Sequence, residues 1–133
     1  MAALGAAGFL LSESFSDEFV RVTRVLPFLY QSTGMPLDVV LGGPGLEEQF
    51  LDRAVAVPVA DFTVPVISPE DLVVTKVLAG RDKDIEDIRG VLRLRADSLD
   101  FDYLRRTLKM IEDALGQSDL LSLFEAELVK IVR

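Results

Sequence analysis

Short apolar runs separated by turn residues dominate the first half of the chain, a pattern typical of β-strands. Residues 19–30 are rich in Val, Leu, Phe and Tyr, and residues 35–41 form a second apolar run. The sequence Ser32-Thr33-Gly34 lies between them. Two such runs joined by a glycine-containing turn predict a β-hairpin.

A second pair of strands is predicted further along. The β-type runs 54–59 and 62–67 are separated only by Ala60-Asp61. Pro58 and Pro65 interrupt these runs, and proline cannot donate a hydrogen bond to a strand ladder. We therefore expect strands that are short, bulged or at the edge of a sheet.

Helices are predicted around and beyond these strands. The glycine-rich stretch 42–45 lacks the pattern of a phosphate-binding loop and predicts a plain turn into a short helix over 46–52. Ser68 is placed to cap a later helix that has Pro69 at its first position and acidic residues in its first turn. Two further apolar stripes predict the last two helices. Asp100 caps the first and Gly116 ends it, and its stripe is Phe101, Leu104, Leu108, Ile111 and Leu115. Ser118 caps the second, whose stripe is Leu121, Phe124, Leu128 and Ile131 or Val132.

The fold class that follows is α+β: a small, mostly antiparallel or mixed sheet packed by helices, with a helical C-terminal half. The chain has 133 residues, of which 50% are hydrophobic. That size and composition suit one compact domain, which we expect to span residues 1–133.

Charge and composition exclude several classes of binding and catalysis. The chain has 22 acidic and 14 basic residues, a net charge of −8, which disfavours broad nucleic-acid binding. It contains no His and no Cys, which excludes imidazole and thiolate catalysis, thiolate metal sites and disulfides. Any catalysis must use carboxylates, amines, guanidinium groups or hydroxyls with a hard cation such as Mg²⁺.

The start of the chain is apolar but carries no targeting signal. Residues 1–11 lack a basic leading segment and are far fewer than the roughly 20 residues of a membrane-spanning helix. We expect a cytoplasmic protein with no membrane partner. The chain opens in the middle of an amphipathic Ala/Leu run, so we also expect a domain that is either truncated at its N-terminus or degenerate.

Asp38 is the first candidate site residue. In a strand over 36–41, alternation places Leu37, Val39 and Leu41 on one face and Asp38 with Val40 on the other. A carboxylate on an apolar strand needs a partner, a cation or an open cleft. Asp38 is therefore either a metal-binding or general-base carboxylate, or an edge-strand Asp that faces water.

The second candidate is a charged cluster in the helical half. If one helix runs through residues 76–87, Lys76, Lys83, Asp84 and Asp87 share a face. Lys76 would then hold a phosphate. The alternative, which composition alone favours, is a solvated face with intrahelical ion pairs, Lys83 with Asp87 and Arg81 with Asp84.

These motifs together resemble the nucleotidyltransferase-fold family, and within it most closely the AbiEii-type toxins and minimal nucleotidyltransferases. The likeness rests on the strand Leu37-Asp-Val-Val-Leu41, the stretch Val64-Pro-Val-Ile-Ser-Pro-Glu-Asp-Leu72, and Lys76 followed by Ala79-Gly-Arg-Asp-Lys-Asp84 and Asp87-Ile88. The resemblance implies a mixed sheet on which three carboxylates hold Mg²⁺, and transfer of a nucleoside monophosphate from a nucleoside triphosphate. Asp38 matches the third of these carboxylates. The family also has a later helix motif of Lys and Asp, which either contacts the nucleotide or supports the site. This motif is matched by Lys76, Lys83, Asp84 and Asp87, with Arg81 beside them.

The chain departs from the family pattern in one respect. The family's first two carboxylates form an Asp-x-Asp motif, and no such motif precedes Asp38. A two-metal site needs carboxylates from both strands. We therefore expect that this chain alone does not catalyse nucleotidyl transfer. The alternative function is a non-catalytic interaction module, in which a homodimer or a partner chain completes an exposed sheet edge.

Overall fold

The computed structural model describes residues 2–12, 15–43 and 45–132, so Met1 and Pro44, which the sequence analysis names within residues 1–11 and 42–45, lie outside the described residues. The chain divides into two compact units, Met1–Glu48 and Gln49–Arg133, which we name the N-terminal unit and the helical unit. One domain over residues 1–133 stays a prediction.

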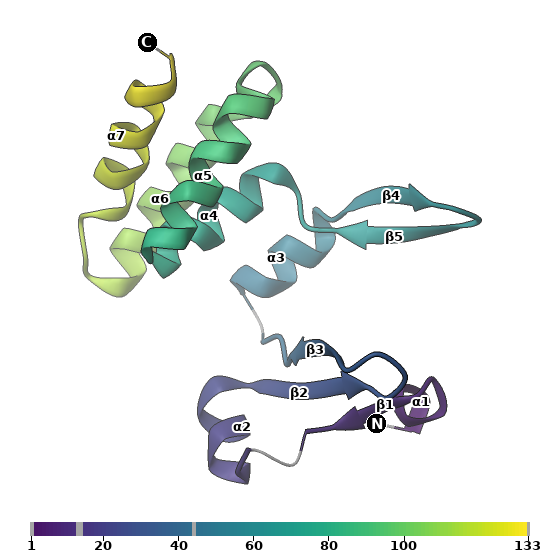
Figure 1. Cartoon of the computed structure of the whole chain (residues 1–133). Helices are drawn as coiled ribbons and strands as arrows, with labels where there is room; N and C mark the ends of the chain where they lie inside the picture. The colour runs from purple at the N-terminus through teal and green to yellow at the C-terminus, as the bar shows by residue number, and fades with distance from the viewer. Residues whose placement is uncertain (1, 13–14, 44, 133) are drawn as a thin grey trace. The chain divides into compact units, whose positions relative to one another are not determined.

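The N-terminal unit is a three-stranded antiparallel sheet with two short helices (Figure 1). The strand order is β1-β2-β3, so that β1 and β3 are the edges. In the register, Leu10 lies opposite Leu29, and Pro27 lies opposite Asp38. The elements are α1 (Ala2–Ala6), β1 (Phe9–Leu11), α2 (Asp17–Thr23), β2 (Val25–Tyr30) and β3 (Met35–Val40).

The predicted hairpin is confirmed as β2 and β3, but the prediction that its first strand begins at residue 19 is wrong. The side chain of Ser16 accepts a hydrogen bond from the backbone N–H of Phe19, and Asp17 and Glu18 occupy the first turn of α2. Such capping residues favour a helix over the β-propensity of the Phe and Val residues that follow. Arg24, with φ 57°, ends α2 and turns the chain into β2.

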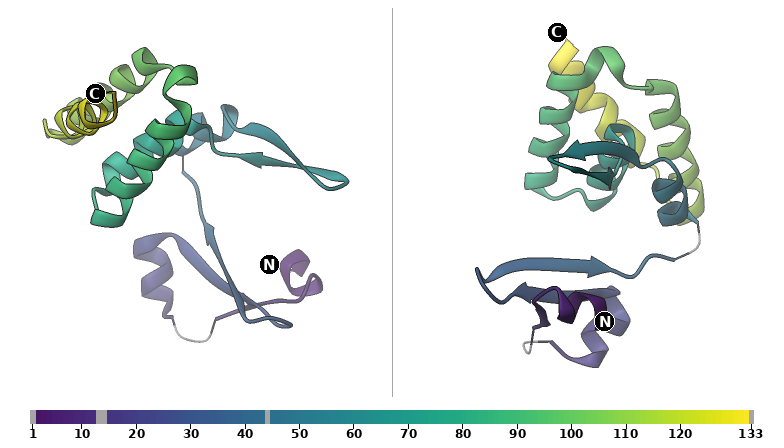
Figure 2. Two further views of the ribbon diagram at one scale, coloured as in Figure 1. Left: turned by 45° about the horizontal axis from the view of Figure 1, so that its top comes forward. Right: turned by 90° about the vertical axis from the view of Figure 1, so that its right-hand side faces the viewer.

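The helical unit consists of one hairpin and a group of packed helices (Figure 2). The helix over 46–52 and the second strand pair are confirmed, and so are the α+β class and the helical C-terminal half. The last helix begins at Leu120, later than a cap at Ser118 would place it. The elements are α3 (Leu46–Asp52, which crosses the boundary between the units), β4 (Val55–Val59), β5 (Phe62–Val66), α4 (Pro69–Ala79), α5 (Asp82–Arg95), a 3₁₀ turn (Ala96–Ser98), α6 (Phe101–Leu115) and α7 (Leu120–Val132).

The hydrophobic core of the helical unit lies among α4, α5, α6 and α7, which contact one another. The predicted caps are confirmed: Ser68 accepts from the N–H of Asp71, and Asp100 accepts from the N–H of Tyr103. No helix in the described part of the chain is long and apolar enough to cross a membrane. The core side chains with no exposed surface are Val73, Val74, Ile88, Leu92, Leu104, Leu108 and Phe124.

Candidate functional site

The charged cluster of the helical unit lies where α4 turns into α5. The prediction of one helix through residues 76–87 is wrong, because Gly80, with φ 61°, ends α4 in the left-handed conformation. Arg81 is extended, and α5 starts at Asp82. This turn folds α5 back against α4, so that residues from two helices meet.

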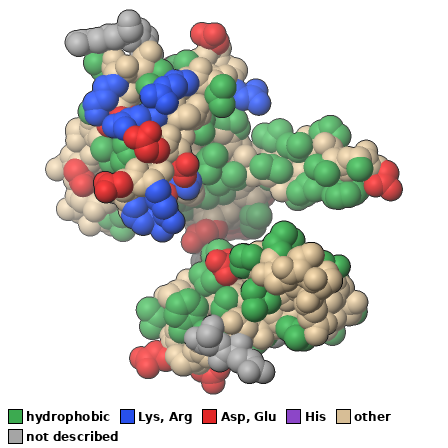
Figure 3. All heavy atoms as spheres, in the orientation of Figure 1, with side chains coloured by type: hydrophobic (Ala, Val, Ile, Leu, Met, Phe, Trp, Pro, Cys, Tyr) green, Lys and Arg blue, Asp and Glu red, His purple; other side chains and the backbone are tan. Residues whose placement is uncertain are grey.

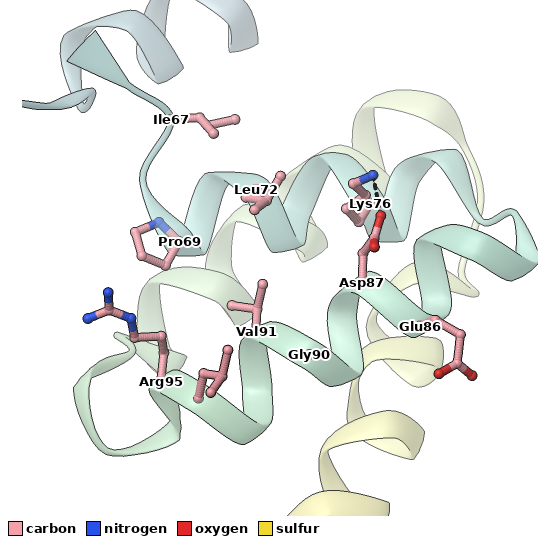
Figure 4. Close-up of a pocket in the computed structure, with 10 residues that line it drawn as sticks. Ile67, Pro69, Leu72, Lys76, Glu86, Asp87, Gly90, Val91 and Arg95 are labelled. Atoms are coloured by element: carbon pink, nitrogen blue, oxygen red, sulfur yellow. Dashed lines mark hydrogen bonds and ion pairs between the residues drawn. The ribbon is translucent and has the colours of Figure 1, made fainter. Parts of the chain in front are cut away.

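Lys76 of α4 bridges two carboxylates of α5, Asp84 and Asp87, and Figure 4 shows its contact with Asp87. Its Nζ lies 3.1 Å from Oδ1 of Asp84 and 2.6 Å from Oδ2 of Asp87. The Asp84 side chain has no exposed surface. The cluster therefore joins the two helices by charge-assisted hydrogen bonds.

Arg81 completes the environment of Asp84. Its Nε donates to Oδ2 at 2.5 Å and its Nη2 to Oδ1 at 3.1 Å, while its backbone N–H donates to Oδ2 at 3.3 Å. The predicted Arg81–Asp84 ion pair is thus confirmed. The predicted Lys83–Asp87 pair is not among the ion pairs of the described residues, in which Asp87 contacts Lys76.

These contacts shift the pKa values of the cluster. Hydrogen bonds from Arg81, and secondarily from Lys76, hold the pKa of Asp84 well below its ordinary value of 3.8, although burial opposes this shift. Hydrogen bonds to Asp87 and then to Asp84 raise the pKa of Lys76. At neutral pH the Asp84 carboxylate is therefore ionised and Lys76 is protonated, so these two side chains form a charged pair.

A groove of about 620 Å³ runs beside this cluster, between α4 and α5. Leu72 and Val91 line it, and Gly90 leaves room because it has no side chain (Figure 4). Lys76 and Asp87 also line it, together with Arg95. The groove is mainly apolar, with charged groups among its lining residues.

Asp38 belongs to the other unit. The predicted alternation is confirmed, since Leu37 and Val39 are half-buried whereas Asp38 and Val40 are exposed. Its cross-strand partner on β2 is Pro27, which offers no hydrogen-bond donor. The structure therefore supplies no neighbouring polar partner on β2 for this carboxylate.

The described residues do not fit a two-metal magnesium centre at Asp38. Magnesium in nucleotide sites is bound by one or two carboxylates together with phosphates and water, and a two-metal centre needs more. Among residues 2–12, 15–43 and 45–132, no group of three or more acidic side chains is placed to hold a metal ion.

A second polar network, around Asp71, was missed by the sequence analysis. Tyr103 donates from its hydroxyl to Oδ1 of the fully buried Asp71 at 2.5 Å, and Arg53 donates from Nε to Oδ2 at 3.1 Å. The Arg53 guanidinium also lies over the Tyr103 ring, 3.8 Å from its centroid, and Gln49 donates to the Tyr103 hydroxyl. Burial, and secondarily Asp71, raise the pKa of Tyr103. The network joins α3 to α4 and α6.

Comparison with known proteins gives one result. Residues 5–122 match the model of a family described as "Nucleotidyltransferase of unknown function (DUF6036)". No curated protein and no solved structure matches the chain.

Proposed function

We propose that this chain, which belongs to the DUF6036 family of nucleotidyltransferases of unknown function, does not catalyse nucleotidyl transfer on its own. The observation that carries the proposal is the isolation of Asp38, the one residue that matches a catalytic carboxylate of the wider fold family. Its cross-strand neighbour is a proline, and the described residues form no three-acid cluster.

The roles of the other candidate residues belong to the same proposal. Because Lys76 and Arg81 are already paired with Asp84 and Asp87, a nucleotide phosphate would have to compete with these carboxylates. We therefore assign the cluster of Lys76, Arg81, Asp84 and Asp87 to support of the α4–α5 junction. Lys83 is exposed on the first turn of α5. The AbiEii-type likeness, a toxin–antitoxin role and a cytoplasmic location stay predictions.

A transfer assay tests the catalytic part of the proposal. The purified chain and an Asp38→Asn variant are incubated with Mg²⁺ and each α-labelled nucleoside triphosphate, and label transferred to protein or to added RNA is measured with released pyrophosphate. We expect no turnover above the rate without protein and no difference between the two chains. Turnover by the parent that Asp38→Asn abolishes would contradict the proposal.

The second candidate function is protein interaction at the free edge of β3. In an antiparallel pair of strands, hydrogen-bonded residue pairs alternate with non-bonded pairs. The N–H of Leu41 donates to the C=O of Arg24, so the next bonded pair along β3 is Val39 with Leu26. The N–H groups of Asp38 and Val40 therefore point to the outer edge, where a strand can add. Two β3 strands paired symmetrically would bring two Asp38 carboxylates onto one face, so a partner chain suits this edge better than a second copy.

An affinity purification compares Val40→Pro with Val40→Ala in tagged chains. The proline removes the outward N–H, whereas the alanine keeps it and shortens the side chain. We expect a partner protein that the parent and Val40→Ala retain and Val40→Pro loses. Equal recovery with both variants would exclude pairing at this edge.

A further inference from the structure

The groove between α4 and α5 has an apolar middle and charged groups at its two ends (Figure 4). Leu72 of α4 and Val91 of α5 line the middle, next to Gly90. A Cβ atom added to Gly90 would meet no neighbouring heavy atom within 4 Å, so the groove is open at this point. Its volume of about 620 Å³ is within the range of small-molecule sites, roughly 300–1,000 Å³.

The length of the groove suits a small molecule. Asp87 lies at one end and Arg95 at the other (Figure 4). Both belong to α5, and the distance between them along the helix axis is about 12 Å. Ten residues line the groove, far fewer than the roughly 20 to 30 residues that each partner contributes to a typical protein interface. The groove is therefore the size of a two-ring or three-ring molecule.

Arg95 supplies an unpaired positive charge at its end of the groove. On the face of the helical unit shown in Figure 3, basic and acidic side chains are interspersed. Lys76 pairs with Asp87, and Arg89 pairs with Glu86. By contrast, no ion pair in the described part of the chain includes Arg95. A negative group at this end meets a cation that has no carboxylate partner of its own.

The distribution of charge favours a ligand with one negative charge. Arg95 neutralises one anionic group, whereas Glu86 and Asp87 at the other end repel a second. The net charge of −8 also opposes a polyanion such as a nucleoside triphosphate. Leu94, which lines the groove next to Arg95 in the sequence, is 82% exposed and adds apolar surface near the cation.

We propose that this groove binds a small amphipathic monoanion, with its apolar body between Leu72 and Val91 and its carboxylate or sulfonate group at the guanidinium of Arg95. Burial of the apolar body drives the binding. The guanidinium donates hydrogen bonds to the anionic group and sets the orientation of the ligand. The groove is open on one side, so we expect a dissociation constant on the order of 10 to 100 µM.

Fluorescence titration with anilinonaphthalenesulfonate, an aromatic probe that carries one sulfonate group, tests the proposal. We expect saturable binding to the purified chain. Gly90→Leu should weaken this binding about tenfold or more, because the leucine side chain fills the groove. Leucine also favours a helix more than glycine does, so the melting temperature of Gly90→Leu should equal or exceed that of the parent.

A groove covered by the N-terminal unit or by a second copy of the chain would show no binding that depends on Gly90. Probe binding that Gly90→Leu leaves unchanged would therefore overturn the proposal.

A second pair of variants separates the charge contact from the apolar contact. Arg95→Gln should weaken binding of the sulfonate probe about threefold, the effect of one exposed charge contact. It should leave unchanged the binding of N-phenylnaphthylamine, which has the same rings without the sulfonate. Arg93→Gln is the matched control, because Arg93 is also exposed on α5 but does not line the groove. Equal weakening of the sulfonate probe by the two variants would rule out recognition of the anion by Arg95.

Discussion

Replacing Asp71 by Ala is expected to lower the free energy of unfolding by about 3 kcal/mol, because it removes a buried carboxylate that accepts two side-chain hydrogen bonds. The Asp71 side chain has no exposed surface, and its two oxygens accept from Tyr103 and Arg53. Without the carboxylate, the Tyr103 hydroxyl and the Arg53 guanidinium lose their acceptor between α3, α4 and α6. The loss of stability is large because these two partly buried donors are left without the carboxylate that accepted their hydrogen bonds.

Urea unfolding followed by circular dichroism measures this effect, and Asp113→Ala is the matched control. Asp113 also pairs with a cation, Lys109, but 67% of its side chain is exposed, so its loss should cost about 0.5 kcal/mol or less. Tyr103→Phe, which keeps the ring under Arg53 and removes only the hydroxyl, should cost about 1 kcal/mol. A loss for Asp71→Ala no larger than that for Asp113→Ala would show that the network does not hold these helices.

Replacing Asp84 by Asn is expected to lower the melting temperature at pH 7 and to flatten its dependence on acid pH. The pKa of Asp84 is lower in the folded chain than its ordinary value of 3.8, mainly because Arg81 hydrogen-bonds its carboxylate. A depressed pKa contributes stability that is fully present above the ordinary value and is lost as the pH falls below it. The parent should therefore lose this contribution below about pH 4, whereas Asp84→Asn has none to lose.

Thermal melts of the two chains between pH 7 and pH 2 check this prediction. The gap between their melting temperatures should be widest near neutral pH and should shrink as the pH falls below 4. The pKa of Glu127 is also lowered, first by Arg89 and then by Lys130, but this group is present in both chains and cancels in the comparison. Asp87→Asn, whose side chain is 53% exposed, should have a smaller effect. A gap that stays constant with pH would contradict the assigned role of Asp84.

Local signals in the sequence predicted much of the fold. Strand alternation placed Asp38 on the exposed face of β3, and the pattern around Ser68 predicted the start of α4 to the residue. Two predictions failed where a single residue decides the backbone. Gly80 breaks the expected long helix, and the capping group at Ser16 makes a helix from residues that favour strands. Gly80 and the capping residues from Ser16 onward are both visible in the sequence, but the runs of apolar residues around them favour the longer helix and the longer strand.

The Asp71 network could not be predicted from the sequence. Its members come from three helices and the turn after α3, with Arg53 lying 18 residues before Asp71 and Tyr103 lying 32 residues after it. No local periodicity connects side chains at such separations. The sequence pattern does group Lys76 with Asp84 and Asp87, but on one helix face. In the structure a turn between two helices brings them together.

The central claim is that Asp38 alone does not make a metal centre in this chain. Titration of Mn²⁺, as a paramagnetic substitute for Mg²⁺, into the ¹⁵N-labelled chain measures this directly through broadening of backbone amide signals. We predict weak, unsaturable broadening spread over the acidic surface, with the same profile in Asp38→Asn. Saturable broadening at low metal concentration, centred on residues 37–39 and abolished by Asp38→Asn, would contradict the claim.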